Sequence, residues 1–182
     1  NPDAYLPNLA TSLNNLGNHL ADLGRPEQAL TPAEEAVRIR RHLAETNPDA
    51  YLPNLATSLN NLGNHLADLG RPEQALTTTE EAVRIRRHLA ETNPDAYLPD
   101  LAISLWAYAR VCVNVQTNLP QALDSITESI TLYHPLTEQL PQRFGGQLFS
   151  AYRTLVDVLD GLGRSDEAAD IRRQLDEVTS GP

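Results

Sequence analysis

Leucines recur at steps of four and three residues through the first part of the chain, with polar residues between them. In an α-helix such steps return to one side at every turn, so the spacing predicts a helix with a single apolar stripe. Pro7 suits its first turn, where a missing N–H costs little, and Gly24 suits the position past its end. The stripe consists of Leu9, Leu13, Leu16, Leu20 and Leu23.

A second helix is predicted from Pro26, with glutamates toward its beginning and arginines toward its end, as the helix dipole favours. Its inward face would carry Ala29, Ala33, Ala36 and Leu43. Helix-end electrostatics and neighbouring acids account for a cluster of basic residues near its end. The cluster consists of Arg38, Arg40 and Arg41.

Two residues of this helix pair need a packing explanation. Gly17 lies in mid-helix, where glycine costs about 1 kcal/mol relative to alanine. We therefore expect the second helix to approach closely there, through Ala29 and Ala36. Pro32 lies well inside the second helix, and we expect a kink there that is absent at its counterpart, Thr78.

The whole pattern repeats every 46 residues. The units cover residues 1–46, 47–92, 93–138 and 139–182, of which the last two are degenerate and the last is a C-terminal cap. A helix pair cannot bury its stripe alone, so the units must stack on one another. The predicted fold is therefore all-α, a single solenoid of about four antiparallel helix pairs. The first two units differ only where Pro32 and Ala33 become Thr78 and Thr79.

Composition narrows the classes of partner. The net charge of −10 argues against nucleic acid, which prefers basic proteins. The single cysteine, Cys112, forms no internal disulfide and is expected to be a small buried hydrophobe. No apolar run approaches the roughly 20 residues that span a bilayer, so we expect no membrane partner and a cytoplasmic location.

No set of residues points to an enzyme. The chain has no lysine, which removes a Schiff base and a phosphate-loop lysine from consideration. The histidines show no zinc-ligand spacing, and His19 with His65, like His42 with His88, are copies made by duplication. We therefore expect no catalytic residues, no metal and no cofactor.

One set of positions carries a family resemblance, which is nearly perfect in the first two units and loose in the other two. The set is Leu13-x-x-Leu16-Gly17-x-x-Leu20, followed by Gly24, Ala29 and Ala36. Its residue types and spacing resemble the tetratricopeptide repeat. Segments 7–16 and 36–40 are similar more narrowly to the long-helix repeats of kinesin light chains and their bacterial relatives. The resemblance implies a right-handed superhelix that binds a protein or peptide in a concave groove, as the scaffold or sensor arm of a larger protein.

Periodicity leaves two polar flanks of the first helix open as binding surfaces. One contains Thr11, Asn14 and Asn18, and the other contains Ser12, Asn15 and His19. The resemblance favours the first flank, because its positions match those that contact peptides in tetratricopeptide repeats. In the later units this flank consists of Thr57, Asn60, Asn64, Ile103, Trp106, Arg110, Ser150, Arg153 and Asp157.

The residue types on this flank are typical of peptide binding. An asparagine amide offers both donors and an acceptor, so a row of them would hold the backbone of an extended peptide without reading its sequence. Trp106 would add an apolar anchor, and Arg110 would add a donor for a carboxylate. The asparagine ladder would consist of Asn14, Asn18, Asn60 and Asn64.

Other interpretations stay open. The asparagines could be solvated surface only, and Trp106 could pack between units. Near-identical units cut at a repeat boundary also leave apolar end faces. The alternative function is therefore a structural array that stacks head to tail into oligomers.

Overall fold

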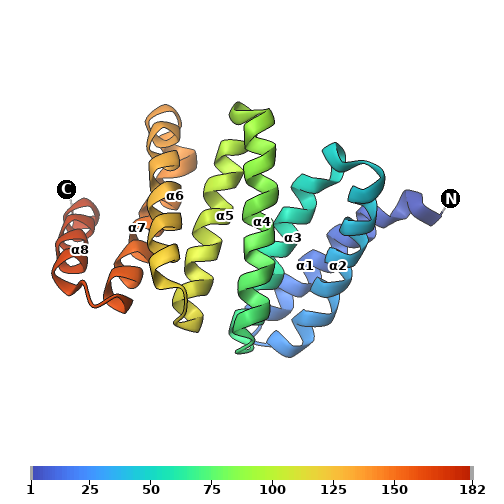
Figure 1. Ribbon diagram of the computed structural model, residues 1–182, viewed down its shortest axis with the longest axis horizontal. Helices are drawn as coiled ribbons and strands as arrows, with labels where there is room; N and C mark the ends of the chain where they lie inside the picture. Colours follow the sequence, from blue (N-terminus) through green and yellow to red (C-terminus); the bar gives the residue numbers. More distant parts are fainter. Residues whose placement is uncertain (1, 181–182) are drawn as a thin grey trace. The chain divides into compact units, whose positions relative to one another are not determined.

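The computed structural model describes residues 2–180, which form helices joined by short turns (Figure 1). No strand occurs in this range, which confirms the predicted all-α fold of helix pairs. A short 3-10 helix, η1 (Pro2–Tyr5), precedes the first pair. The helices are α1 (Leu6–Asp22), α2 (Pro26–Thr46), α3 (Pro48–Asp68), α4 (Pro72–Thr92), α5 (Pro94–Val115), α6 (Leu119–Gln139), α7 (Pro141–Gly161) and α8 (Ser165–Ser180).

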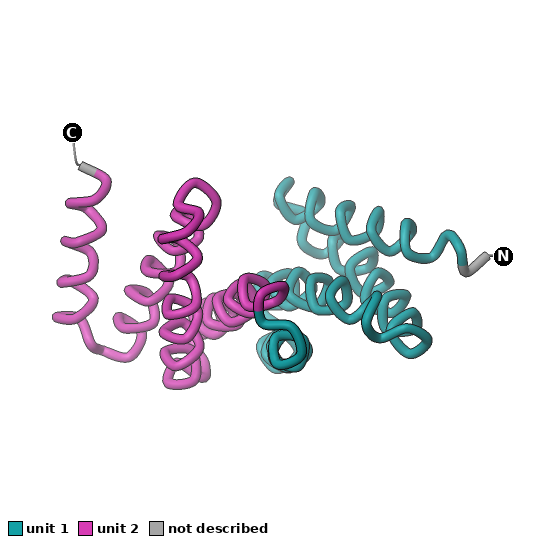
Figure 2. Tube along the Cα trace, turned by 90° about the horizontal axis from the view of Figure 1, so that it is seen from above, with its two compact units in different colours: residues 1–94 teal, residues 95–182 magenta. Residues whose placement is uncertain are grey.

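The chain divides into two compact units, residues 1–94 and residues 95–182 (Figure 2). In the first unit, α2 packs between α1 and α3, and α3 also packs against α4. In the second, α7 packs against both α6 and α8, and Oγ of Ser129 on α6 donates a hydrogen bond to the Ala102 carbonyl of α5 (2.8 Å). Consecutive helices are therefore neighbours in space within each unit. The limits of the four repeats stay a prediction.

The first helix of the second repeat begins earlier than the leucine pattern predicts. α1 begins beside Pro7, as expected, whereas α3 begins at Pro48 and continues through Pro53, the counterpart of Pro7. Asn47 explains the early start, because its Oδ1 accepts a hydrogen bond from the backbone N–H of Ala50 (3.3 Å). Proline at the first helical position supports the same start. α2 likewise continues through its internal proline, Pro32, and the kink expected there stays a prediction.

Gly17 lies on α1 directly against α2. A Cβ atom added to Gly17 would lie 3.2 Å from the Ala29 carbonyl oxygen and 3.4 Å from the Ala33 Cβ. The predicted close approach at Ala29 is therefore confirmed, whereas Ala33 rather than Ala36 supplies the next contacts. Small residues on both helices are what allow this separation.

The second repeat is tighter at the same position. A Cβ atom added to Gly63 would lie 2.3 Å from Cγ2 of Thr79, which is fully buried. Thr79 replaces the alanine of the first repeat, and its hydroxyl donates to the Ala75 carbonyl of its own helix (2.9 Å). Glycine is therefore more strictly required in the second repeat than in the first.

Gly63→Ala is expected to lower the free energy of unfolding by about 1–3 kcal/mol, because overpacking against Thr79 exceeds the gain in helix propensity. Urea unfolding of the full chain measures this difference. Thr79→Ala in the same chain should recover most of the loss. Gly17→Ala is the matched control, with a smaller expected effect, and a loss that persists in the Gly63→Ala, Thr79→Ala double variant would contradict the steric explanation.

In three of the four repeats, a glycine follows the end of the first helix. Gly24, Gly70 and Gly163 have φ of +70°, +65° and +75°, the left-handed conformation that glycine adopts without strain. Gln116 stands at the equivalent position after α5 with φ of +52°, and Asn118 follows with φ of +54°. The turn between α5 and α6 therefore carries backbone strain.

Gln116→Gly is expected to raise the free energy of unfolding by about 1 kcal/mol, the usual cost of a left-handed conformation for a residue with a Cβ atom. Thermal or urea unfolding measures the change. The matched reverse variant, Gly70→Gln, should lower stability by a similar amount. No gain for Gln116→Gly would show that the hydrogen bond from Nε2 of Gln116 to the Val113 carbonyl (2.6 Å) outweighs the strain.

Candidate partner-binding site

Asn14, the first member of the predicted ladder, is buried between α1 and α3. Its Oδ1 accepts hydrogen bonds from the Ser58 hydroxyl (2.9 Å) and from Nδ2 of Asn61 (3.2 Å). Only 7% of its surface is exposed. The oxygen of this amide is therefore already used to join the first helices of consecutive repeats. The sequence analysis considered the asparagine as a peptide-binding amide or as solvated surface, and did not include this role.

Arg40 completes this buried network from α2. Its Nη1 donates to the Asn54 carbonyl (2.9 Å) and to the Ser58 hydroxyl (2.5 Å), and its Nη2 lies 3.4 Å from the Thr11 hydroxyl. Arg40 is buried, and burial lowers the pKa of its guanidinium. The expectation that Arg40 serves helix-end electrostatics together with Arg38 is therefore wrong. The sequence could have indicated its burial, because Arg40 follows Ala36 by one helical turn and so lies on the same inward side of α2.

The same buried position changes chemistry along the chain. In the second repeat, Nη2 of Arg86 donates to the Thr57 hydroxyl (2.8 Å). In the third repeat the position is Tyr133, which is fully buried. Burial, and to a lesser extent the negative charge of Asp100, raises the pKa of Tyr133 to about 12. The third repeat therefore replaces a buried cation by a neutral ring.

The other asparagines of the ladder are less accessible than a groove of free amides would require. Asn60 is 7% exposed, and Asn18 and Asn64 are half-buried. Their contact with a peptide stays a prediction.

Trp106 links two helices and is only half-buried. Its Nε1 donates a hydrogen bond to Oγ1 of Thr154 on α7 (2.8 Å), and the residue is half-buried. The guanidinium carbon of Arg110 lies 5.7 Å from the ring centroid, within the range of a cation–π contact. Trp106 and Thr154 occupy the repeat positions of Asn14 and Asn61, so the same link between first helices is made with different side chains.

Arg153 and Asp157 project from α7 into a hollow of about 380 Å³ that α8 closes on its other side. Burial and the nearby charge of Asp160 raise the pKa of the Asp157 carboxyl, and Arg153 and Arg172 partly oppose that shift. Arg172 forms an ion pair with Asp160. The full lining is Phe149, Arg153, Val156, Asp157, Arg172, Leu175 and Asp176.

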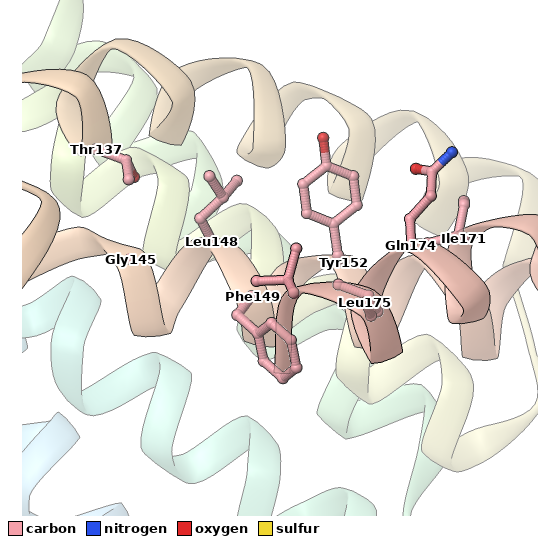
Figure 3. A pocket seen from close by; sticks show the side chains of 9 residues that line it. Thr137, Gly145, Leu148, Phe149, Tyr152, Ile171, Gln174 and Leu175 are labelled. Atoms are coloured by element: carbon pink, nitrogen blue, oxygen red, sulfur yellow. The ribbon is translucent and has the colours of Figure 1, made fainter. Parts of the chain in front are cut away.

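A more apolar hollow of about 300 Å³ lies next to it, also between α7 and α8 (Figure 3). Phe149 and Leu175 line both hollows. Gly145 lines the second one, at a position where earlier repeats have leucine, so a missing side chain leaves this space. Tyr152 also lines this hollow, and its hydroxyl lies 2.9 Å from Nε2 of His134. The sequence pattern did not reveal this hollow.

Neither a membrane-spanning helix nor a cluster of metal ligands occurs in the range from residue 2 to residue 180. No helix there has both the length and the apolar character to cross a lipid bilayer. No three histidine, cysteine, aspartate or glutamate side chains there lie close enough together to hold a metal ion.

The two copies of one histidine have different environments. His19 is exposed, whereas His65 is 5% exposed and its Nε2 has no hydrogen-bond partner among the residues described. Burial lowers the pKa of His65, although the carboxylates of Asp68 and Asp22 act in the opposite direction. The folded protein therefore favours neutral His65.

Stability is expected to fall as the pH drops below about 6.5, because the unfolded chain then takes up a proton that folded His65 resists. The slope should approach about 1.4 kcal/mol per pH unit between the unfolded pKa and the lower folded pKa of this residue. Urea unfolding at pH 5 to 8 measures it. His65→Gln should flatten the profile and the matched variant His19→Gln should not; equal profiles for all three chains would contradict the role of His65.

Comparison with known families agrees with the repeat geometry. Residues 9–49 and 55–95 each match the family model described as tetratricopeptide repeat. These two segments of the chain are therefore tetratricopeptide repeats. Curated proteins give no match to the chain.

Two solved structures resemble this chain. The first is a crystal structure of nearly identical TPR-like repeats from a Podosopora anserina chain designated a kinesin light chain. It is 17% identical, with a TM-score of 0.67 over 95% of this chain and 77% of that chain, and the likeness concerns the fold. The second, a variant of those repeats, is 16% identical and has a TM-score of 0.45 over 97% of this chain and 96% of that chain.

Proposed function

We propose that this tetratricopeptide repeat protein binds an acidic, extended segment of a partner protein at one surface of α5 and α7. This Trp106 surface consists of Trp106, Arg110 and Arg153. The observation that supports it most is a half-buried indole ring accompanied by two exposed arginines. Neither arginine forms an ion pair within the described part of the chain.

The tryptophan supplies an apolar anchor whose orientation is set before binding. Its Nε1 is already hydrogen-bonded to Thr154, so the ring does not lose a water partner when a ligand covers it. Large aromatic residues in fixed positions are the usual hot spots of protein interfaces. Ile103, one helical turn earlier on α5, is 41% exposed and extends the apolar area.

The arginines determine the preferred charge of the partner. Arg110 touches the ring but no carboxylate, so its donors remain available for a carboxylate or a backbone carbonyl. Arg153 lies near Asp157, whose carboxylate partly neutralises it. We therefore expect Arg110 to contribute more than Arg153 to the selection of acidic peptides. The chain as a whole has a net charge of −10, so the positive charge of these two arginines should attract an acidic ligand to this surface rather than to others.

The proposed role is non-enzymatic recognition, in which the repeats act as the scaffold or sensor arm of a larger protein. Repeat folds of this class present extended binding surfaces, and the Trp106 surface offers an anchor and charged donors. A bacterial source and a cytoplasmic location stay predictions from the sequence. Self-association also stays a prediction, and light scattering over a range of protein concentrations tests it without any ligand.

Binding is tested with two matched peptide sets of equal length, one alternating leucine with aspartate or glutamate and one alternating leucine with asparagine or glutamine. Trp106 is the only tryptophan, so its fluorescence reports directly on this surface. We expect the acidic set to bind at least about tenfold more tightly, and the difference to shrink as salt is added.

Variants assign the effect to named residues, with binding measured by calorimetry. Trp106→Ala should weaken binding of the acidic peptides by about 2–4 kcal/mol, the size of an interface hot spot. Arg110→Glu should weaken it by about tenfold or more. Arg143→Glu is the matched control, because Arg143 also stacks on an aromatic ring, that of Phe144 (5.0 Å), at a different place on α7. Equal binding of the two peptide sets, or equal losses for Arg110→Glu and Arg143→Glu, would contradict the proposal.

A further inference from the structure

A shallow groove of about 640 Å³ lies between α6 and α8 in the second unit. Both helices pack on α7, which contributes the floor of the groove (Figure 1). The α6 residues that line it extend from Leu123 to Thr131, which is about 12 Å along the helix axis. This length corresponds to about two turns of a helix laid along α6. We call this space the α6–α8 groove.

The floor of the α6–α8 groove is apolar. Leu123, Leu155 and Ile171 come from α6, α7 and α8, and each of them is half-buried. They pack against a buried core cluster that includes Leu159 and Ala168. Each of the three helices therefore leaves one large apolar side chain partly open to solvent. Exposed apolar side chains framed by polar ones are typical of interaction sites.

The walls of the groove are acidic. Asp124 and Glu128 line it from α6 and Glu167 lines it from α8, whereas Arg164 is the one base among the lining residues. Arg164 already forms an ion pair with Glu167 (2.7 Å). The Asp124 carboxylate is exposed and has no ion-pair partner in the described part of the chain. A ligand that enters the groove therefore meets uncompensated negative charge beside an apolar floor.

The corresponding hollow of the first unit has a different charge. It has a volume of about 460 Å³ and lies at the same repeat positions, because its Arg38 and Leu62 correspond to Thr131 and Leu155. Two arginines, one histidine and two glutamates line it, so its acids are balanced by bases. The acidic character is therefore specific to the second unit and does not follow from the repeat itself.

The second unit also lacks a bridge between its second helices. In the first unit, Arg41 of α2 forms an ion pair with Glu81 of α4 (2.8 Å). The repeat positions of these two residues are occupied by His134 on α6 and Gln174 on α8. Nε2 of His134 instead lies 2.9 Å from the Tyr152 hydroxyl of α7. This pair of positions therefore does not tie α6 to α8, which leaves the space between them open.

The floor, the walls and the length together indicate one kind of occupant. We propose that the α6–α8 groove binds a basic amphipathic helix of a partner protein. Leucines or isoleucines spaced by three and four residues along such a helix cover the apolar floor. Lysines or arginines beside this stripe face Asp124 and the other carboxylates of the walls. A helix suits an apolar floor because its backbone hydrogen bonds are internal, so the floor need not supply partners for them.

The α6–α8 groove is separate from the Trp106 surface. Leu155 and Leu159 follow Arg153 and Asp157 on α7 by two residues each, which is a step of about 200° around the helix. The groove and Arg153 therefore lie on opposite sides of α7. The two sites also prefer partners of opposite charge, so binding at one is testable without the other.

Three peptides of about 15 residues, long enough to form a helix, test the proposal on the full chain by calorimetry. The lysine peptide has a leucine stripe flanked by lysines, and the second peptide has glutamates in place of the lysines. The third has the composition of the lysine peptide in an order without a stripe. We expect the lysine peptide to bind at least about tenfold more tightly than either of the others, and added salt to weaken its binding.

Two variants add positive charge to the groove. Thr131→Arg introduces the arginine that both earlier repeats have at this position, and should weaken binding of the lysine peptide at least about tenfold. Thr131→Gln is the matched control of similar length without charge and should have a smaller effect. Asp124→Lys should also weaken binding at least about tenfold. Its control is Glu138→Lys, near the other end of α6 and outside the groove, which should leave binding nearly unchanged.

A third variant should strengthen binding. Arg164→Gln removes the base that neutralises Glu167, so the lysine peptide should bind about two- to fivefold more tightly. Damage to the fold would not produce such a gain. Trp106 fluorescence should stay unchanged when the lysine peptide binds, because Trp106 does not line the groove.

Several results would overturn the proposal. Equal binding of the lysine peptide and its counterpart without a stripe would show that charge alone attracts it. Equal losses for Asp124→Lys and Glu138→Lys would place the peptide elsewhere on the acidic surface of the chain. A change in Trp106 fluorescence on binding would assign the lysine peptide to the Trp106 surface instead of the groove.

Discussion

The packing of the first unit depends on one buried guanidinium that donates hydrogen bonds to neutral oxygens. From α2, Arg40 donates hydrogen bonds to a carbonyl and a hydroxyl on α3 and to a hydroxyl on α1. A single side chain therefore links three helices. A buried charge is tolerated only when its hydrogen-bond donors have acceptors. The Ser58 hydroxyl, which accepts from Arg40, in turn donates a hydrogen bond to Oδ1 of Asn14. This requirement fixes the register of α2 on α3 more narrowly than leucine packing would, because apolar contacts tolerate sliding.

A repeated sequence does not give repeated environments. Leu16 and Leu62, or His19 and His65, are the same residue in the same helix, and the preceding helix pair determines which copy is buried. Stability in such an array therefore resides largely in the contacts between neighbours, as expected for repeats that cannot bury their stripe alone. The charge state of a histidine consequently follows from its position in the array, since burial lowers the pKa of His65 in particular.

The sequence predicted the features that follow from spacing alone: the helix pairs, the close approach at Gly17, and the glycine turn at Gly24. It did not predict that Arg40 is buried, because a basic residue near a helix end is usually solvated. Its inward position was also hard to recognise within a cluster of arginines. It placed Asn14 on a polar flank of its helix but could not show how far the next helix covers that flank, which depends on tertiary packing. The cavity beside Gly145 was equally hidden, since it arises from a side chain that is missing relative to the other repeats.

In the proposed binding site, the third repeat uses a structural link between helices as the anchor for a partner. At the position where Asn14 joins α1 to α3 through small polar groups, Trp106 joins α5 to α7 through its indole N–H and is only half-buried. Thr154, which accepts that bond, is itself tied to the Ser150 carbonyl (3.2 Å), so the ring is held by two bonds in series. An anchor held in this way loses little rotamer freedom on binding, which favours affinity. Changes that loosen α5 from α7 would therefore weaken recognition without touching the ligand.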